Sequence, residues 1–171
     1  YGTITDNNAL SVGASGFSVS FWAQFPEGHP GNSKMILKKS SEYTVKFDGS
    51  GNLTFTLVDS SNGPALIVLT ATTPSTHKIF DGSWHMLTFT YAGGGGNNGV
   101  DTQKVIRYVD GALEAKGGTV SDGNFAQIRN TSNNIFISYD PASLTGCKIN
   151  ISEIALWSSE LDATNVQAII G

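Results

Sequence analysis

Apolar and polar residues alternate along several short segments of this chain. In residues 17–25 the odd positions are apolar and the even positions are polar, with Trp22 as the exception. Residues 53–57 alternate leucine and phenylalanine with threonine, and residues 87–91 repeat the pattern. A period of two predicts β-strands with one buried face and one wetter face. Shorter β-branched or aromatic runs predict further strands at residues 35–37, 43–47, 66–69, 105–109 and 135–137, and a longer strand is predicted at residues 147–157.

Turn residues separate these segments. Residues 93–99 contain four consecutive glycines followed by Asn-Asn-Gly, which continue neither strand nor helix cheaply. Asp110-Gly111 lies between apolar flanks and predicts a tight hairpin, because glycine accepts the positive φ of such a turn. The stretch from Trp84 to Leu113 is therefore expected to be a β-meander.

Two local signals near the end of the chain predict irregular features. The apolar phase changes at Ser152-Glu153, which indicates a β-bulge, because one extra residue moves the following side chains to the other face. Asp162 can cap a short final helix that carries Val166, Ile169 and Ile170.

Many short strands with turns between them predict an all-β fold, a two-sheet antiparallel jelly-roll β-sandwich with a short C-terminal helix. We expect residues 1–171 to form one domain, since no linker or repeat interrupts them. Trp22, Trp84 and Trp157 lie within or at the ends of strand runs, and we expect their rings to fill the gap between two sheets about 10 Å apart. The alternative for these rings is a platform on which a sugar stacks.

Composition excludes some classes of partner. A net charge of −4 and a pI near 5.2 argue against nucleic acid and anionic membrane surfaces. Lys38-Lys39, the only basic run, is interpreted as a solvated strand end. No apolar run reaches the ~20 residues of a transmembrane helix.

The single cysteine, Cys147, excludes an internal disulfide and is expected to be a small buried residue. Because the sequence begins at Tyr1 without methionine or a signal pattern, we expect a processed product or a domain of a longer protein.

Four segments, in this order, resemble the concanavalin A-like lectin/glucanase superfamily, in particular its laminin G-like and pentraxin-like domains. They are Phe17–Trp22, Asp81–Leu87, the Tyr-Val-Asp-Gly hairpin within Arg107–Gly111, and Ile151–Leu161. The ordered set implies the sandwich fold. It does not define the function, because this fold carries lectins, glycosidases, adhesion modules and spacers.

Enzymes of the superfamily resembled here carry two acidic residues close together on one strand, typically in Glu-x-Asp-x-x-Glu, to cleave a glycosidic bond. The sequence contains no such cluster, and its acidic residues are scattered. Its three histidines show no spacing typical of a metal cluster or a catalytic triad. We therefore expect no enzyme and assign no catalytic residue.

The same resemblance implies a Ca²⁺ site at a loop rim and, by position, assigns Glu42 and Asp140 as ligands. The sequence departs from the pentraxin pattern, because the acidic run Glu-Gln-Asp is absent around Asp140 and the following loop is short. The alternative is that both carboxylates are ordinary solvated turn residues. Tyr139, His29 and the loop 93–99 are candidate ligand-binding positions, because polar aromatic and flexible residues suit a sugar or protein surface.

We therefore predict a non-enzymatic recognition module of a larger protein, extracellular or on a virion surface, that binds a glycan or a surface protein. The alternative is a structural decoration or fibre domain of a tailed bacteriophage, with homo-oligomeric or virion neighbours. A glycoside hydrolase is the third hypothesis, and it lacks its carboxylate pair. No nucleic-acid partner and no membrane insertion are expected.

Overall fold

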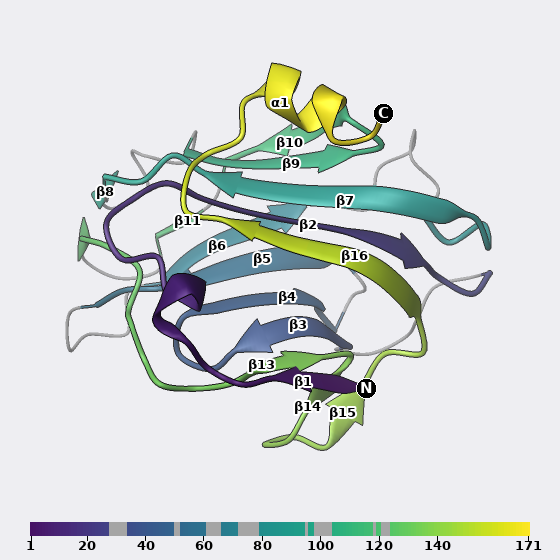
Figure 1. Cartoon of the computed structure of the whole chain (residues 1–171), viewed down its shortest axis with the longest axis horizontal. Coiled ribbons are helices and arrows are strands. Elements are labelled where there is room, and N and C mark those ends of the chain that lie inside the picture. Colours follow the sequence, from purple (N-terminus) through teal and green to yellow (C-terminus); the bar gives the residue numbers. More distant parts are fainter. Residues whose placement is uncertain are drawn as a thin grey trace.

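The chain folds into two antiparallel β-sheets that face each other (Figure 1). The structure is a computed structural model and describes residues 1–27, 34–49, 52–60, 66–71, 79–94, 96–97, 104–117, 119–120 and 124–171. Within these residues, a seven-stranded sheet has the order β1 (Gly2–Ile4), β13 (Ile135–Ile137), β3 (Met35–Lys39), β4 (Tyr43–Phe47), β5 (Leu53–Val58), β6 (Leu66–Ala71) and β11 (Thr119–Val120). The five-stranded sheet has the order β10 (Ala112–Lys116), β9 (Val105–Val109), β7 (Trp84–Tyr91), β2 (Phe17–Gln24) and β16 (Asn150–Trp157).

Smaller elements complete the described structure. Two short strand pairs are β8 (Gly96–Asn97) with β12 (Asn124–Phe125), and β14 (Tyr139–Asp140) with β15 (Thr145–Gly146). The helices are the 3-10 turn η1 (Asn8–Leu10) and α1 (Ala163–Ala168). Neither helix in this part of the chain has the length or apolar character needed to cross a membrane. The predicted jelly-roll sandwich with a short C-terminal helix is confirmed.

Phenylalanine and tyrosine rings, not tryptophans, fill the space between the sheets. Phe21 and Phe89 are fully buried with ring centroids 6.3 Å apart, and Phe55 lies 5.2 Å from Phe89. The expectation for the three tryptophans is wrong, because none of them belongs to the buried core of the described residues. The even positions of β2 point away from the core, and Trp22 occupies one of them.

The C-terminal segment covers one half of the outer face of the five-stranded sheet. The side chain of Val166 on α1 is fully buried and packs in a cluster with Ile106, Tyr108 and Leu161, against which Trp157 is also packed. Asp162 caps the helix as predicted, because its Oδ1 accepts a hydrogen bond from the Asn165 N–H at 2.8 Å. Among the described residues, neither helix covers the other half of this face, toward the end of β2, where Trp84 is exposed (Figure 1).

Both predicted backbone irregularities are present. Asp110 and Gly111 have φ values of 48° and 73°, the left-handed conformation expected of this two-residue turn. The register between β16 and β2 shifts between Ser152 and Ala155, and Glu153 there has a φ of 51°. The bulge keeps the isoleucines before and after it packed against the same core.

The prediction for Cys147 is also confirmed. Its side chain is buried in the core, and burial raises the pKa of its thiol to about 11, outweighing the nearby charge of Lys34. The thiol is therefore protonated at neutral pH.

Candidate functional site

Three polar or aromatic side chains form a row on the open half of the five-stranded sheet. In the strand register Trp84 of β7 lies opposite Gln24 of β2, and Gln24 lies opposite Asn150 of β16. Residues that face each other across neighbouring strands point to the same side of a sheet. The Trp84–Gln24–Asn150 row therefore lies on the outer face, with the indole of Trp84 44% exposed.

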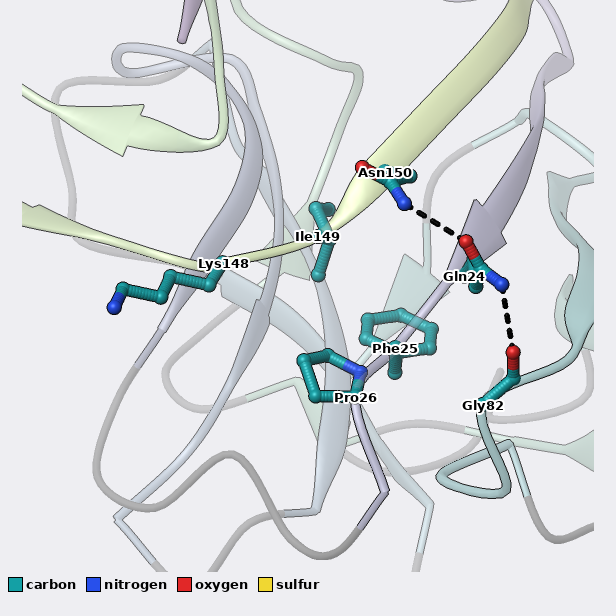
Figure 2. A pocket seen from close by; sticks show the side chains of 7 residues that line it. All are labelled: Gln24, Phe25, Pro26, Gly82, Lys148, Ile149 and Asn150. Carbon is teal, nitrogen blue, oxygen red and sulfur yellow. Dashed lines mark hydrogen bonds between the residues drawn. The ribbon is translucent and has the colours of Figure 1, made fainter.

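Hydrogen bonds fix the two amides of this row. Asn150 Nδ2 donates to Gln24 Oε1 at 2.8 Å, and Gln24 Nε2 donates to the Gly82 carbonyl at 2.7 Å (Figure 2). Asn150 is exposed, and the bond to Gln24 leaves its Oδ1 and one of its N–H groups available to a ligand. An amide with a free oxygen and a free N–H can accept a hydrogen bond from a ligand hydroxyl or donate one to it.

A pocket of about 360 Å³ adjoins the amides. Phe25 lines this pocket, and contacts with two other aromatic rings fix its position. Its ring centroid lies 5.4 Å from that of Phe47 and 5.5 Å from that of Phe80. None of the lining residues carries a carboxylate, and Lys148 alone among them is charged; they are Gln24, Phe25, Pro26, Gly82, Lys148, Ile149 and Asn150. This lining suits binding, whereas glycosidic cleavage needs two carboxylates that flank the bond.

A histidine fixes the loop that leads into Trp84. His85 Nε2 lies 3.1 Å from Asp81 Oδ1, and His85 Nδ1 lies 2.8 Å from Asp110 Oδ2. Asp81 Oδ1 also accepts from the Ser83 N–H at 2.7 Å, so the turn that presents the Gly82 carbonyl is held from two sides. Burial lowers the pKa of His85, but the bonds to Asp110 and Asp81 outweigh it and raise that pKa overall.

The predicted metal ligand Glu42 lies in the interior and already contacts a cation. Its side chain is fully buried, and its Oε1 accepts from the ammonium of Lys39 and from the Thr131 N–H. The interpretation of Lys38-Lys39 as a solvated strand end is thus wrong for Lys39, which is 0% exposed.

Asp140, the second predicted metal ligand, pairs with the other lysine. Lys38 Nζ donates to Oδ1 and Oδ2 of Asp140 at 2.9 and 3.0 Å, and the Ala142 N–H and the Ser143 hydroxyl donate to the same carboxylate. Successive residues of a strand point to opposite faces, so Lys38 and Lys39 place Asp140 and Glu42 on opposite sides of β3. The structure does not bring the two predicted ligands together, and among the described residues no group of three or more potential ligand side chains is arranged to hold a metal.

The predicted ligand-binding residue Tyr139 does not itself line the second groove of the described structure, but it contacts Tyr1, which does. Its ring stacks on that of Tyr1, with centroids 4.8 Å apart, and Tyr1 is 92% exposed. This groove of about 480 Å³ runs beside β16 and shares Lys148 and Ile149 with the pocket next to Asn150. His29 and part of the loop 93–99 lie outside the described residues.

The Trp84–Gln24–Asn150 row was not predicted from the sequence. Gln24 and Asn150 are ordinary amides until the register aligns them with Trp84. One signal was present, because Trp22 interrupts an otherwise regular polar face and Trp84 shares that face. The His85 bridge joins residues 81 and 110, and only the first of these is near His85 in sequence.

The comparisons with known proteins agree with this architecture. The family model described as the concanavalin A-like lectin/glucanases superfamily matches residues 1–167. The structure is similar to the binding domain of botulinum neurotoxin serotype G, with a TM-score of 0.71 and 18% identity over 98% of this chain and 39% of that one. No curated protein matches the sequence.

Two further similar structures have bound ligands. One is the ligand binding domain of botulinum neurotoxin serotype D in complex with N-acetylneuraminic acid, with a TM-score of 0.65 and 16% identity over 98% of this chain and 39% of that one. The other is the binding domain of botulinum neurotoxin DC in complex with rat synaptotagmin II, with a TM-score of 0.59 and 17% identity over 98% and 38%. This chain thus spans about two fifths of each of these relatives, and at these identities the likeness shows the fold alone.

Proposed function

Because the chain belongs to the concanavalin A-like lectin/glucanase superfamily, we propose that it is a non-enzymatic, extracellular recognition domain that binds a glycan at the Trp84–Gln24–Asn150 row. The observation that carries this proposal is an exposed indole in register with two fixed amides on an open sheet face. The relatives' complexes with N-acetylneuraminic acid and with synaptotagmin are compatible with a binding domain.

The chemistry of the row matches the surface of a sugar. A pyranose ring has an apolar face of C–H groups that packs on an aromatic ring, and a rim of hydroxyls that pair with amides. Trp84 offers the first, and Gln24 and Asn150 offer the second. The side chains are already placed by strand register and hydrogen bonds, so binding costs little conformational entropy.

A glycan-array experiment with the wild-type chain tests the proposal, followed by calorimetry with the best ligand. Trp84→Ala and Asn150→Ala should each weaken binding by about tenfold or more, since a lost stacking or amide contact is worth roughly 1–2 kcal/mol. Leu113→Ala is the matched control, because Leu113 is an exposed residue of the same sheet outside the row. An array without any bound glycan would overturn the function, and wild-type affinity in Trp84→Ala would overturn the site.

The assignment of Tyr139 as a ligand-binding residue remains part of this proposal. Its stacked pair with Tyr1 is aromatic and accessible, as recognition surfaces often are. Tyr139→Ala in the same assays shows whether the Tyr1–Tyr139 pair contributes to binding. The bacteriophage alternative remains a prediction, and the relatives described above do not include a virion protein.

A further inference from the structure

The ammonium of Lys39 lies in a cage of oxygen atoms. Asp6 Oδ1, Ser11 Oγ and the Thr131 carbonyl each lie 2.9 Å from Lys39 Nζ, and Glu42 Oε1 is also in contact with it. These oxygens come from four separate segments: the chain after β1, the end of η1, the β3–β4 turn and the chain before β13. One cation therefore joins parts of the chain that are up to 125 residues apart, counted from Asp6 to Thr131.

The cage contains more acceptors than one ammonium can satisfy. A lysine has three N–H donors, whereas four oxygens surround Nζ. Glu42 Oε1 accepts three further hydrogen bonds. The donors are the Thr131 N–H, the Thr131 hydroxyl and the Ser11 hydroxyl. Glu42 Oε2, in contrast, is buried and has no hydrogen-bond partner. A fully buried carboxylate oxygen without a partner is costly, so this carboxylate has acceptor capacity that the lysine does not use.

The charges around the cage leave it negative. Asp6 and Glu42 contribute two carboxylates, and Lys39 contributes one positive charge. Tyr43 also faces the cage, with its hydroxyl 3.3 Å from the Leu10 carbonyl. This hydroxyl donates its hydrogen bond to the Leu10 carbonyl and adds no charge to the cage. Without the lysine charge, two carboxylates would share a nearly dry site, which is the setting that favours a divalent cation.

We propose that Lys39 is a built-in structural cation of this domain, whose ammonium fills a preformed oxygen site that binds Ca²⁺ once the lysine charge is removed. The oxygens around the ammonium, Asp6 Oδ1, Ser11 Oγ, Glu42 Oε1 and the Thr131 carbonyl, are the hard donors that Ca²⁺ takes. Glu42 Oε2, the unpartnered oxygen of the same carboxylate, and water would complete a shell of six to eight. The native protein has no need of Ca²⁺ at Glu42, contrary to what its family resemblance implies. This inference does not depend on the glycan proposal.

The adjacent lysine provides a matched control. Lys38 pairs with a single carboxylate, Asp140, on the opposite face of β3, and the Ala142 N–H and Ser143 hydroxyl also hold that carboxylate. A divalent cation would find one acidic group there instead of two. Lys38→Met should therefore lose some stability without becoming sensitive to calcium.

Thermal unfolding with EDTA or with Ca²⁺ tests the proposal. Wild type and Lys38→Met should have the same Tm in both conditions. Lys39→Met should have a lower Tm in EDTA, and calcium at ~100 times its Kd should raise that Tm by more than about 5 °C. The double variant Lys39→Met with Glu42→Gln should lose this response, because it removes one of the two carboxylates. A Lys39→Met Tm that calcium does not change, or a wild-type Tm that calcium raises, would overturn the proposal.

Two measurements cover the case in which Lys39→Met does not fold in EDTA. Calcium-dependent recovery of its near-ultraviolet circular dichroism would support the proposal, and a chain that stays unfolded in calcium would contradict it. In the wild type, nitrogen-detected NMR should show a slowly exchanging Lys39 ammonium, and added Ca²⁺ should leave the Thr131 amide signal unmoved. A rapidly exchanging ammonium, or a Thr131 signal that titrates with calcium, would contradict it.

Discussion

The Nδ1 atom of His85 lies 2.8 Å from Asp110 Oδ2, at the turn between β9 and β10. The Nε2 atom of the same ring lies 3.1 Å from Asp81 Oδ1, so one imidazole joins two carboxylates. A neutral imidazole has one N–H, whereas imidazolium has two. Only the protonated ring can donate to both carboxylates, and protonation therefore ties the loop before Trp84 to the hairpin.

The first prediction concerns pH. Because the pKa of His85 is raised in the folded chain, the stability that its bridge contributes is fully present below the unfolded pKa of about 6.5 and is lost as pH rises through the folded pKa. The Tm difference between wild type and His85→Asn should therefore shrink between about pH 6 and pH 9. An NMR titration should give a His85 midpoint above about 6.5.

Asp110→Asn is the control for this titration. Asparagine keeps the Oδ1 acceptor that binds the Met86 N–H at 2.8 Å, and it tolerates the positive φ of this position. It removes the charge that His85 faces, so the His85 midpoint should fall. A midpoint that is the same in both proteins would show that Asp110 does not hold the proton.

The second prediction concerns the ion pair of Lys38 and Asp140. Burial raises the pKa of Asp140, but the bonds from Lys38, Ala142 and Ser143 outweigh it and lower that pKa overall. The stability it contributes is therefore present above the unfolded pKa of about 3.9 and is lost as pH falls through the folded value. Lys38→Met should cost about 1–2 kcal/mol at pH 7 in urea unfolding, and the cost should decline below about pH 4. A cost that does not vary with pH would contradict this account.

The third prediction compares two aromatic residues of β7. Phe89 is fully buried between Phe21 and Phe55, so Phe89→Ala should lower the free energy of unfolding by about 3–5 kcal/mol. Trp84 is a larger side chain but lies on the open outer face, and Trp84→Ala should cost less than about 1 kcal/mol. Equal losses in a denaturant titration would mean that the indole is part of the core.

The fourth prediction compares two neighbouring glycines. Gly93 and Gly94 have φ values of 79° and 74°, so alanine meets similar backbone strain at both. A Cβ on Gly93 would lie 2.8 Å from the Gly16 nitrogen and 2.9 Å from the Ser15 carbonyl carbon, whereas at Gly94 the nearest atom is the flexible Lys104 Nζ at 3.6 Å. Gly93→Ala should therefore cost about 1–3 kcal/mol more than Gly94→Ala in urea unfolding. Equal costs would show that the contact with residues 15–16 is loose.

The period of two predicted most of the sandwich, because each long strand has one face on a shared core. Residues 43–47 and 105–109 form strands at the predicted bounds, and the strand predicted at residues 87–91 begins three residues earlier, at Trp84. The short pieces β1, β14 and β15 were not predicted, since two or three residues carry no period. Their positions depend on distant partners: β1 pairs with β13, and Asp140 of β14 bonds to Lys38.

The candidate site was harder to predict, because it depends on the arrangement of strands. Glu42 and Asp140 were assigned by their position in the family resemblance, and the sequence does not show that successive lysines on β3 contact them from opposite faces. Gln24 and Asn150 are 126 residues apart and become partners only through the pairing of β2 with β16. The alternation of apolar and polar residues does indicate the face on which a residue lies. It places Trp22 on the outer face, and the structure agrees, although large rings are usually buried.

The bulge in β16 has a consequence for how these domains behave at high concentration. β16 is the last strand of its sheet, and its outer rim offers backbone groups to which another molecule's strand could add. The shift at Ser152–Ala155 breaks the rim into two short stretches, and the charged Glu153 projects at the break. Two copies therefore cannot join their β16 rims into one continuous ladder, and edge-to-edge pairing through this strand is disfavoured.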